Sequence, residues 1–147
     1  MTSIRQLLKS KNHNLYSVGP TDTVYAAIKM MAEKDVGSLL VMEGDQLVGL
    51  FTERQYARDV FLKGRSSPQT LVRDIMESRV ICVAPDDTVE ICMALMTKKR
   101  VRHLPVIDGD RVVGIVSIGD LVKSIIDDQR FTIDQLENFI HGKVIRH

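Results

Sequence analysis

An internal repeat constrains the fold of this 147-residue chain more strongly than any other feature of its sequence. The stretch that begins at Val18, VGPTDTVYAAIKMMAEKDVGSLLVMEGDQLVGLF, aligns without gaps on the stretch that begins at Val83, VAPDDTVEICMALMTKKRVRHLPVIDGDRVVGIV. Self-similarity of this kind determines the architecture before any single residue does. A unit of roughly 60 residues is too small to bury a good core alone. We therefore predict one globule in which the two copies pack face to face about a pseudo-twofold axis.

Both copies predict the same order of elements. After Pro20 and Pro85, apolar residues recur at helical spacing, which indicates one amphipathic helix per copy. Two apolar runs follow, divided by a turn that contains Gly-Asp at 44–45 and 109–110, and this pattern predicts a hairpin. A second amphipathic helix then begins after a hydroxyl residue. The expected fold is α/β (α+β), with two β-α-β-β-α repeats and short N-terminal and C-terminal helices.

The repeat also predicts the division of the chain. We assign residues 1–68 to the first repeat with an N-terminal helix, 69–129 to the second repeat, and 130–147 to a C-terminal helix and tail. A weaker echo precedes each copy, because TSIRQLL near the N-terminus resembles TLVRDIM at 70–76. In the tail, Thr132 and Gln135 stand at capping-box spacing, which predicts a helix over 131–142. The apolar side of that helix suits either the core of this chain or a second subunit, and of the two we favour the subunit contact.

Composition excludes several classes of function. A net charge of +1 gives no global field that would attract nucleic acid or an anionic membrane. We expect a cytoplasmic protein, since the sequence shows neither a signal peptide nor a membrane span. Cys82 and Cys92 are expected to be reduced, and the four histidines show no metal-ligand spacing, so we predict no metal. No nucleotide-hydrolysing loop, dinucleotide fingerprint or paired nucleophile and base is present, so we expect no enzyme.

Two positions in the repeat differ in a way that bears on function. Ser117 and Asp120 stand where the first copy has Thr52 and Gln55. Both pairs fit a helix-capping box, which needs no ligand. The same helix start also suits a phosphate, with the Ser117 hydroxyl as a donor, and the Asp120 carboxylate suits the two hydroxyls of a ribose. Gln55 offers one acceptor oxygen and no charge, so the first copy is expected to hold a ribose less well.

The basic run at 98–103, KKRVRH, is the second candidate feature. Its first three residues close a helix, where cations suit the helix dipole, and a solvated cluster is expected there. Arg102 and His103 open the next strand, and we expect both to face the cleft that contains Ser117. A guanidinium suits phosphate through its bidentate geometry, and an imidazole can donate one hydrogen bond. An exposed strand end without a ligand accounts for both residues equally well.

The ordered motifs resemble a known family. V-x-P-x-D-T-V, the Gly-Asp hairpin and G-h-h-[ST]-x-x-[DN] are similar to the cystathionine-β-synthase (CBS) domain, and the tandem copies resemble a Bateman module, as in small freestanding bacterial CBS-pair proteins. The resemblance covers residues 4–128, and Gln55 is its one departure, where the family has Asp or Asn. It implies two clefts between the repeats that bind AMP, ADP, ATP, S-adenosylmethionine or NAD. It also implies flat dimers that regulate another protein.

The resemblance further implies which residues meet the nucleotide. Residues before V-x-P lie along the base in the family, which points to Tyr16, Ser17 and Val18 and to Ile81, Cys82 and Val83. Strand-to-helix packing is an equally good interpretation for Val18 and Val83. The remaining candidates are Ser38, Thr52, Arg54, Arg58 and Pro105; Arg54 and Arg58 are phosphate contacts that would compensate for Gln55, and Pro105 marks a strand irregularity at the cleft.

Two functional hypotheses follow from these observations. The leading one is a regulatory module that senses energy or redox state by binding an adenine nucleotide and signals to an unknown target through repeat or homodimer packing. The alternative is a dimeric interaction scaffold whose clefts no longer bind nucleotide. Neither hypothesis involves a catalytic cofactor.

Overall fold

The computed structural model describes residues 2–10, 14–130, 134 and 136. Most of the helix predicted over 131–142 therefore lies outside the described residues. The elements that precede the second copy begin with α1 (Ile4–Ser10), β1 (Ser17–Val18), α2 (Val24–Lys34), β2 (Ser38–Glu43) and β3 (Gln46–Thr52). They continue with α3 (Glu53–Gln55), the π-helical turn η1 (Tyr56–Phe61) and the 3-10 turns η2 (Ser67–Gln69) and η3 (Val72–Asp74). The second copy supplies α4 (Val89–Lys99), β4 (His103–Asp108), β5 (Arg111–Ser117) and α5 (Ile118–Asp128). These elements confirm the predicted α+β fold of two repeats.

The first helices of the two copies are built alike. Thr23 and Thr88 cap α2 and α4, because their side chains accept from the backbone N–H three residues on. Both helices end in a left-handed residue that is not glycine, Asp35 with φ 54° and Arg100 with φ 55°. These are the only non-glycine residues with positive φ in the described part of the chain. The same unusual backbone thus recurs at equivalent places, with side chains of opposite charge.

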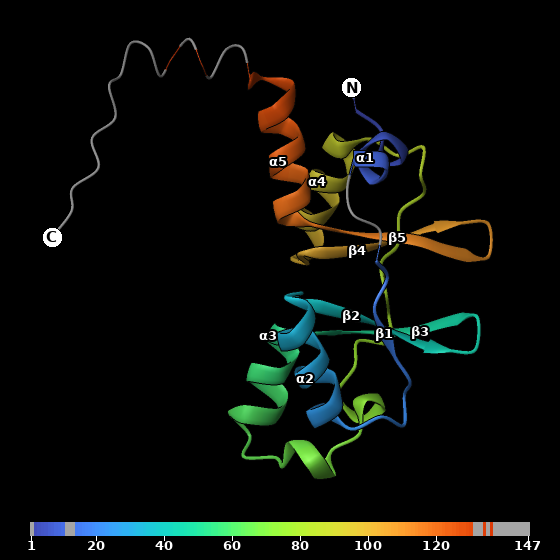
Figure 1. Ribbon diagram of the computed structural model, residues 1–147, viewed down its shortest axis with the longest axis vertical. Helices are drawn as coiled ribbons and strands as arrows, with labels where there is room; N and C mark the ends of the chain where they lie inside the picture. The colour runs from blue at the N-terminus through green and yellow to red at the C-terminus, as the bar shows by residue number, and fades with distance from the viewer. Residues whose placement is uncertain (1, 11–13, 131–133, 135, 137–147) are drawn as a thin grey trace, which may run out of the picture.

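The strands form two hairpins that lie next to each other in the middle of the molecule, with the helices on their outer sides (Figure 1). β2 pairs with β3 and β4 with β5, both antiparallel, and Gly44 and Gly109 turn each hairpin at φ 61° and 63°. In the first copy β1 also pairs with β2, in parallel. The equivalent pairing in the second copy is reduced to the single bridge Val83–Val106, because Pro105 has no N–H to donate. The predicted first strand of that copy is therefore one bridge long.

The two hydrophobic cores exchange the segments that precede them. Ile4, Leu7 and Leu8 of α1 are buried with the second copy, among Val83, Val89, Cys92, Met96, Leu104, Val106, Val116 and Leu121. Val72 and Ile75, which come before the second copy in sequence, are buried with the first copy. No residue belongs to both clusters. The N-terminal helix, assigned to the first repeat by sequence, thus packs with the second.

Backbone hydrogen bonds repeat the exchange on both sides. The N–H groups of Ile4 and Arg5 donate to the carbonyls of Asp87 and Pro85, each at 2.8 Å. In the first copy, those of Val72 and Arg73 donate to Asp22 and Pro20, each at 2.9 Å. The echo between TSIRQLL and TLVRDIM is therefore structural, since each segment occupies the same place on the opposite copy.

Candidate functional site

The helix start at Ser117 fixes the position of Asp120. The Ser117 hydroxyl accepts from the Asp120 N–H at 3.1 Å, and Oδ2 of Asp120 accepts from the Ser117 N–H at 2.8 Å. The first copy has the same box: Thr52 Oγ1 accepts from the Gln55 N–H at 3.2 Å, and Gln55 Oε1 accepts from the Thr52 N–H at 3.0 Å. The capping interpretation is confirmed in both copies.

The two capping boxes place different chemical groups at the starts of α3 and α5. The Gln55 amide uses its single oxygen in the box, and its other end is a donor. The Asp120 carboxylate has a second oxygen, and each carboxylate oxygen can accept more than one hydrogen bond. At the capping-box position the second copy therefore has a charged acceptor group that suits a pair of hydroxyls, whereas the first copy has a neutral amide.

Asp120 lines a cleft of about 420 Å³, which we call the Asp120 cleft. From the second copy the cleft is lined by His103, Ile115, Ser117 and Asp120. From the first copy and its lead-in it is lined by Asn14, Tyr16, Lys34, Asp35, Val36, Gly37, Ser38 and Leu40. The half-buried Asp120 side chain thus faces a cavity that both copies build.

Contacts across the cleft bring the copies together. A Cβ built on Gly37 would lie 3.5 Å from Nε2 of His103, so the imidazole of the second copy rests against the backbone of the first. The Lys34 ammonium lies 5.5 Å from the centroid of the Tyr16 ring, within the range of a cation–π contact. The cleft therefore combines a carboxylate, an imidazole, an aromatic ring and an ammonium group.

The predicted site residues do not all lie in one cavity. Those that line the Asp120 cleft are Tyr16, Ser38, His103, Ser117 and Asp120. Arg54 and Arg102 line a different pocket, so the expectation that Arg102 faces the Ser117 cleft is not met. Neighbouring residues at a strand start point to opposite sides, and this alternation separates Arg102 from His103.

The other candidates line neither pocket. Val18 and Val83 are core residues, as the packing interpretation required, and Pro105 is also buried. Ser17 is exposed in β1, Arg58 is exposed on η1, and Thr52 caps α3. Ile81 and Cys82 are half-buried, and Ile81 packs against the second core. Burial raises the pKa of the Cys82 thiol, and both cysteines are free thiols, as expected.

Seven lining residues were not among the sequence candidates. They are Asn14, Lys34, Asp35, Val36, Gly37, Leu40 and Ile115. Most come from the turn that joins α2 to β2, where the sequence KDVG carries no motif. The left-handed backbone of Asp35 turns this segment into the cleft.

The described residues contain no group of three or more His, Cys, Asp or Glu side chains that could hold a metal ion. No described helix is long and apolar enough to cross a membrane.

Comparison with known proteins identifies the family. The model of the CBS domain matches residues 4–60 and again 72–127. The chain belongs to the CBS-domain family. The two matches correspond to the two repeats, so the protein is a CBS-domain pair, and such pairs are generally regulatory ligand-binding modules rather than catalysts.

Relatives of this CBS pair are known in bacteria and plants. A solved protein with CBS domains from Burkholderia ambifaria is 52% identical with a TM-score of 0.84, over 87% of this chain and 96% of that one. A CBS-domain containing protein from Agrobacterium tumefaciens is 33% identical with a TM-score of 0.80, over 85% and 94% of the two chains. The mitochondrial CBS domain-containing protein CBSX3 of Arabidopsis thaliana is 40% identical over 96% of this chain and 73% of its own length.

Proposed function

We propose that this CBS pair is a regulatory module that binds an adenosine-bearing ligand, AMP in the first instance, in the Asp120 cleft. The observation that carries the proposal is the Asp120 carboxylate, held by its capping box in a cavity lined by both copies. A ribose diol supplies two donors that match a carboxylate. The α5 N-terminus and the Ser117 hydroxyl suit a phosphate.

The remaining lining residues support an adenosine in this cleft. Tyr16, Leu40 and Ile115 offer apolar and aromatic surface to a base. His103 and Lys34 supply donors that suit a single phosphate. NAD, ADP and ATP share the adenosine part and are the other members of the proposed ligand class.

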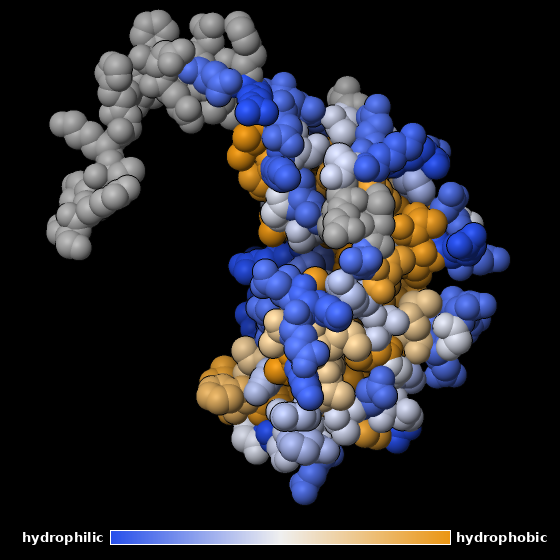
Figure 2. Space-filling model, in the orientation of Figure 1, coloured by the Kyte–Doolittle hydropathy of each residue, from blue (hydrophilic) through white to orange (hydrophobic). Residues whose placement is uncertain are grey.

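We propose that the module signals through a homodimer. Apolar side chains are exposed on the helical side of both halves, where Figure 2 shows them at the left edge. Among the exposed large apolar side chains of the described residues are Phe61 at 70% and Leu62 at 74% in the first copy and Ile91 at 53% and Ile126 at 47% in the second. Exposed apolar groups of this kind are typical of subunit contacts.

Calorimetric titration with adenosine and AMP tests the nucleotide site. Asp120→Asn is the sharp variant, because the amide oxygen can still cap α5 while the charge is lost. Charge-assisted bonds contribute about 1.5–3 kcal/mol each, so we expect binding to weaken by roughly tenfold or more. Gln55→Asn is the matched control in the other copy and is expected to leave the affinity unchanged.

A result against the proposal is equally clear. Ligand at a hundred times its Kd should stabilise the fold by about 2.7 kcal/mol. If neither adenosine, AMP nor NAD at millimolar concentration gives heat or raises the unfolding temperature, the Asp120 cleft is not a nucleotide site.

The second candidate function is a dimeric interaction scaffold, favoured by the exposed helical face and by Gln55. This candidate requires Asp120→Asn to leave the dimer, and the binding of any partner protein, unchanged. Analytical ultracentrifugation with and without AMP separates the two, because only the nucleotide module changes its self-association with ligand.

A further inference from the structure

The charged side chains around the Asp120 cleft are mostly acidic. Asp35 of the first copy and Asp120 of the second both line it. A third carboxylate is close by, because Oε1 of Glu53 would lie 3.9 Å from a Cβ built on Gly37, another lining residue. Lys34 is the one lysine or arginine among the described residues that line the cleft. Carboxylates at the cleft therefore outnumber ammonium and guanidinium groups.

Two nearby groups can offset this negative charge only in part. The Lys34 ammonium lies over the ring of Tyr16. The imidazole of His103 is cationic only when both of its nitrogens are protonated. Within the described part of the chain, no side chain forms an ion pair with Asp35. The exposed Asp35 carboxylate thus keeps its charge at the cleft without a paired cation.

The two helix ends at the cleft have opposite polarity. α5 begins there at Ser117, and its first N–H groups suit one phosphate. α2 ends there with Asp35 as its C-cap, and the Val36 N–H donates to the Met31 carbonyl at 3.1 Å. The last carbonyls of a helix carry a partial negative charge, which disfavours an anion. The cleft thus offers one favourable place for a phosphate, while the wall from the first copy is negative.

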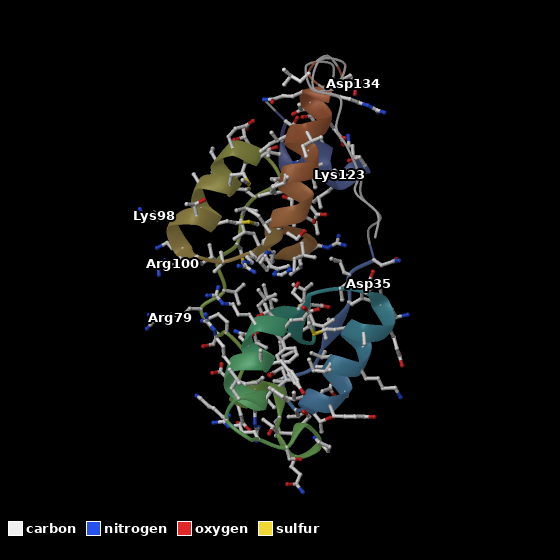
Figure 3. The ribbon with its side chains drawn as sticks, turned by 90° about the vertical axis from the view of Figure 1, so that its left-hand side faces the viewer. Asp35, Arg79, Lys98, Arg100, Lys123 and Asp134 are labelled. Carbon is white, nitrogen blue, oxygen red and sulfur yellow. The ribbon has the colours of Figure 1, made fainter. Side chains whose placement is uncertain are left out.

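The fold does not require an acid at position 35. Arg100 forms the equivalent C-cap of α4, at φ 55° against 54° for Asp35. Figure 3 shows Asp35 at the level where the copies meet, on the side of the molecule opposite Arg79 and Arg100. The Asp35 charge is therefore not needed to end the helix, and its effect falls on what the cleft can hold.

We infer that Asp35 is a specificity-determining residue of the Asp120 cleft, which limits the adenosine ligand to one phosphoryl group or none. The inference rests on the proposed function and deepens it. A single phosphate can use the α5 N-terminus, whereas each further phosphoryl group brings more negative charge into a cleft that Asp35 and Asp120 line. Specificity of this kind comes from repulsion of the wrong ligand as much as from contacts to the right one.

Displacement of bound adenosine by AMP, ADP and ATP is the test, because it counts only binding in the cleft that holds adenosine. In a buffer without divalent cations, the affinity of the unmodified chain should fall from AMP to ADP to ATP. Asp35→Asn removes the charge, and asparagine tolerates the left-handed backbone. The ratio of AMP affinity to ATP affinity should then fall by about threefold or more, since the repulsion acts on every charge of the triphosphate. At about 1 M salt, where the Debye length is about 3 Å, this change should largely disappear.

Asp45→Asn is the matched control. It makes the same chemical change at an exposed position in the turn of the first hairpin, which does not line the cleft, so it should leave the ratio unchanged. Unfolding temperatures without ligand verify that each variant is folded. If Asp35→Asn does not fold, Asp35→Gly carries the same test, because glycine adopts the left-handed backbone readily and also removes the charge.

Three outcomes would overturn the inference while leaving the proposed function in place, since adenosine binds in all of them. The first is an ATP affinity of the unmodified chain that equals or exceeds its AMP affinity. The second is a ratio that Asp35→Asn leaves unchanged, and the third is an equal fall of the ratio in Asp45→Asn. Failure of the proposed function looks different: neither adenosine nor AMP binds the unmodified chain, and the inference then fails with it.

Discussion

Replacing Ile4 by alanine tests the exchange of segments between the two cores. Ile4 lies at the N-terminus, yet its side chain is 0% exposed and packs among residues of the second copy. Its N–H donates to the Asp87 carbonyl at 2.8 Å, which holds α1 against the start of α4. If α1 were an appendage of the first repeat, this residue would contribute little to stability.

The expected loss can be worked from the side chain. Isoleucine to alanine removes three buried carbons, which at about 0.8 kcal/mol each gives roughly 2.4 kcal/mol of lost transfer free energy. The cavity left behind adds about 1 kcal/mol or more, so the free energy of unfolding should fall by about 3–4 kcal/mol. Val72, the equivalent residue in the first core, is also 0% exposed. Val72→Ala removes two carbons and should cost about 2–3 kcal/mol.

Urea denaturation followed by circular dichroism measures both changes. With a slope of about 2 kcal/mol per molar urea, Ile4→Ala should lower the midpoint by roughly 1.5–2 M. Arg5→Ala is the neighbouring control: its ion pair with Asp86 is 3.2 Å long, and the two side chains are 49% and 88% exposed. An exposed pair of this kind contributes about 1 kcal/mol at most. A loss below about 1 kcal/mol for Ile4→Ala, or one no larger than that for Arg5→Ala, would refute the exchanged packing.

Two further predictions concern close packing and a buried thiol. Gly114→Ala should destabilise the protein by about 1–3 kcal/mol in the same denaturation assay, because the new Cβ would lie 2.7 Å from Cδ2 of Leu8. Gly119→Ala is the control and should be close to neutral, because its Cβ would lie 3.6 Å from the nearest atom, Oγ of Ser117. Burial, with the charge of Asp87 as a second cause, raises the pKa of the Cys92 thiol from 9.0 to about 11, so the unfolded chain releases this proton at lower pH than the folded one. The free energy of unfolding should therefore decline as the pH rises from about 9 to 11. Cys92→Ala should remove that part of the decline when the free energy of unfolding is measured against pH.

Local patterns predicted the repeated elements because each has a local cause. The threonine before each first helix, the Gly-Asp turns and the hydroxyl residue before each second helix act within a few residues, and the structure confirms them. The second helix of the first copy differs in detail, because α3 continues into the π-helical turn η1. The capping boxes were predicted for the same reason, and with them the position of Asp120 on the first turn of α5.

The features that could not be predicted from the sequence depend on contacts between distant segments. Nothing in the sequence near Ile4 indicates that its side chain packs with the buried residues of the second copy, from Val83 onward. The walls of the Asp120 cleft come from both copies, so residues such as Asn14 and Asp35 become candidates only when the copies are in place. Arg102 was assigned to the wrong cavity because the side to which a residue points at a strand start depends on the strand's exact beginning, at His103.

The arrangement of cores and cavities explains how a ligand could act on this module. The two hydrophobic clusters share no residue, so burial within each core does not by itself fix how the copies sit on each other. The Asp120 cleft, in contrast, has walls from both copies, with His103 of the second against Gly37 of the first. A ligand that contacts both walls favours the arrangement in which both contacts are made, and it shifts the equilibrium only by its difference in affinity between arrangements.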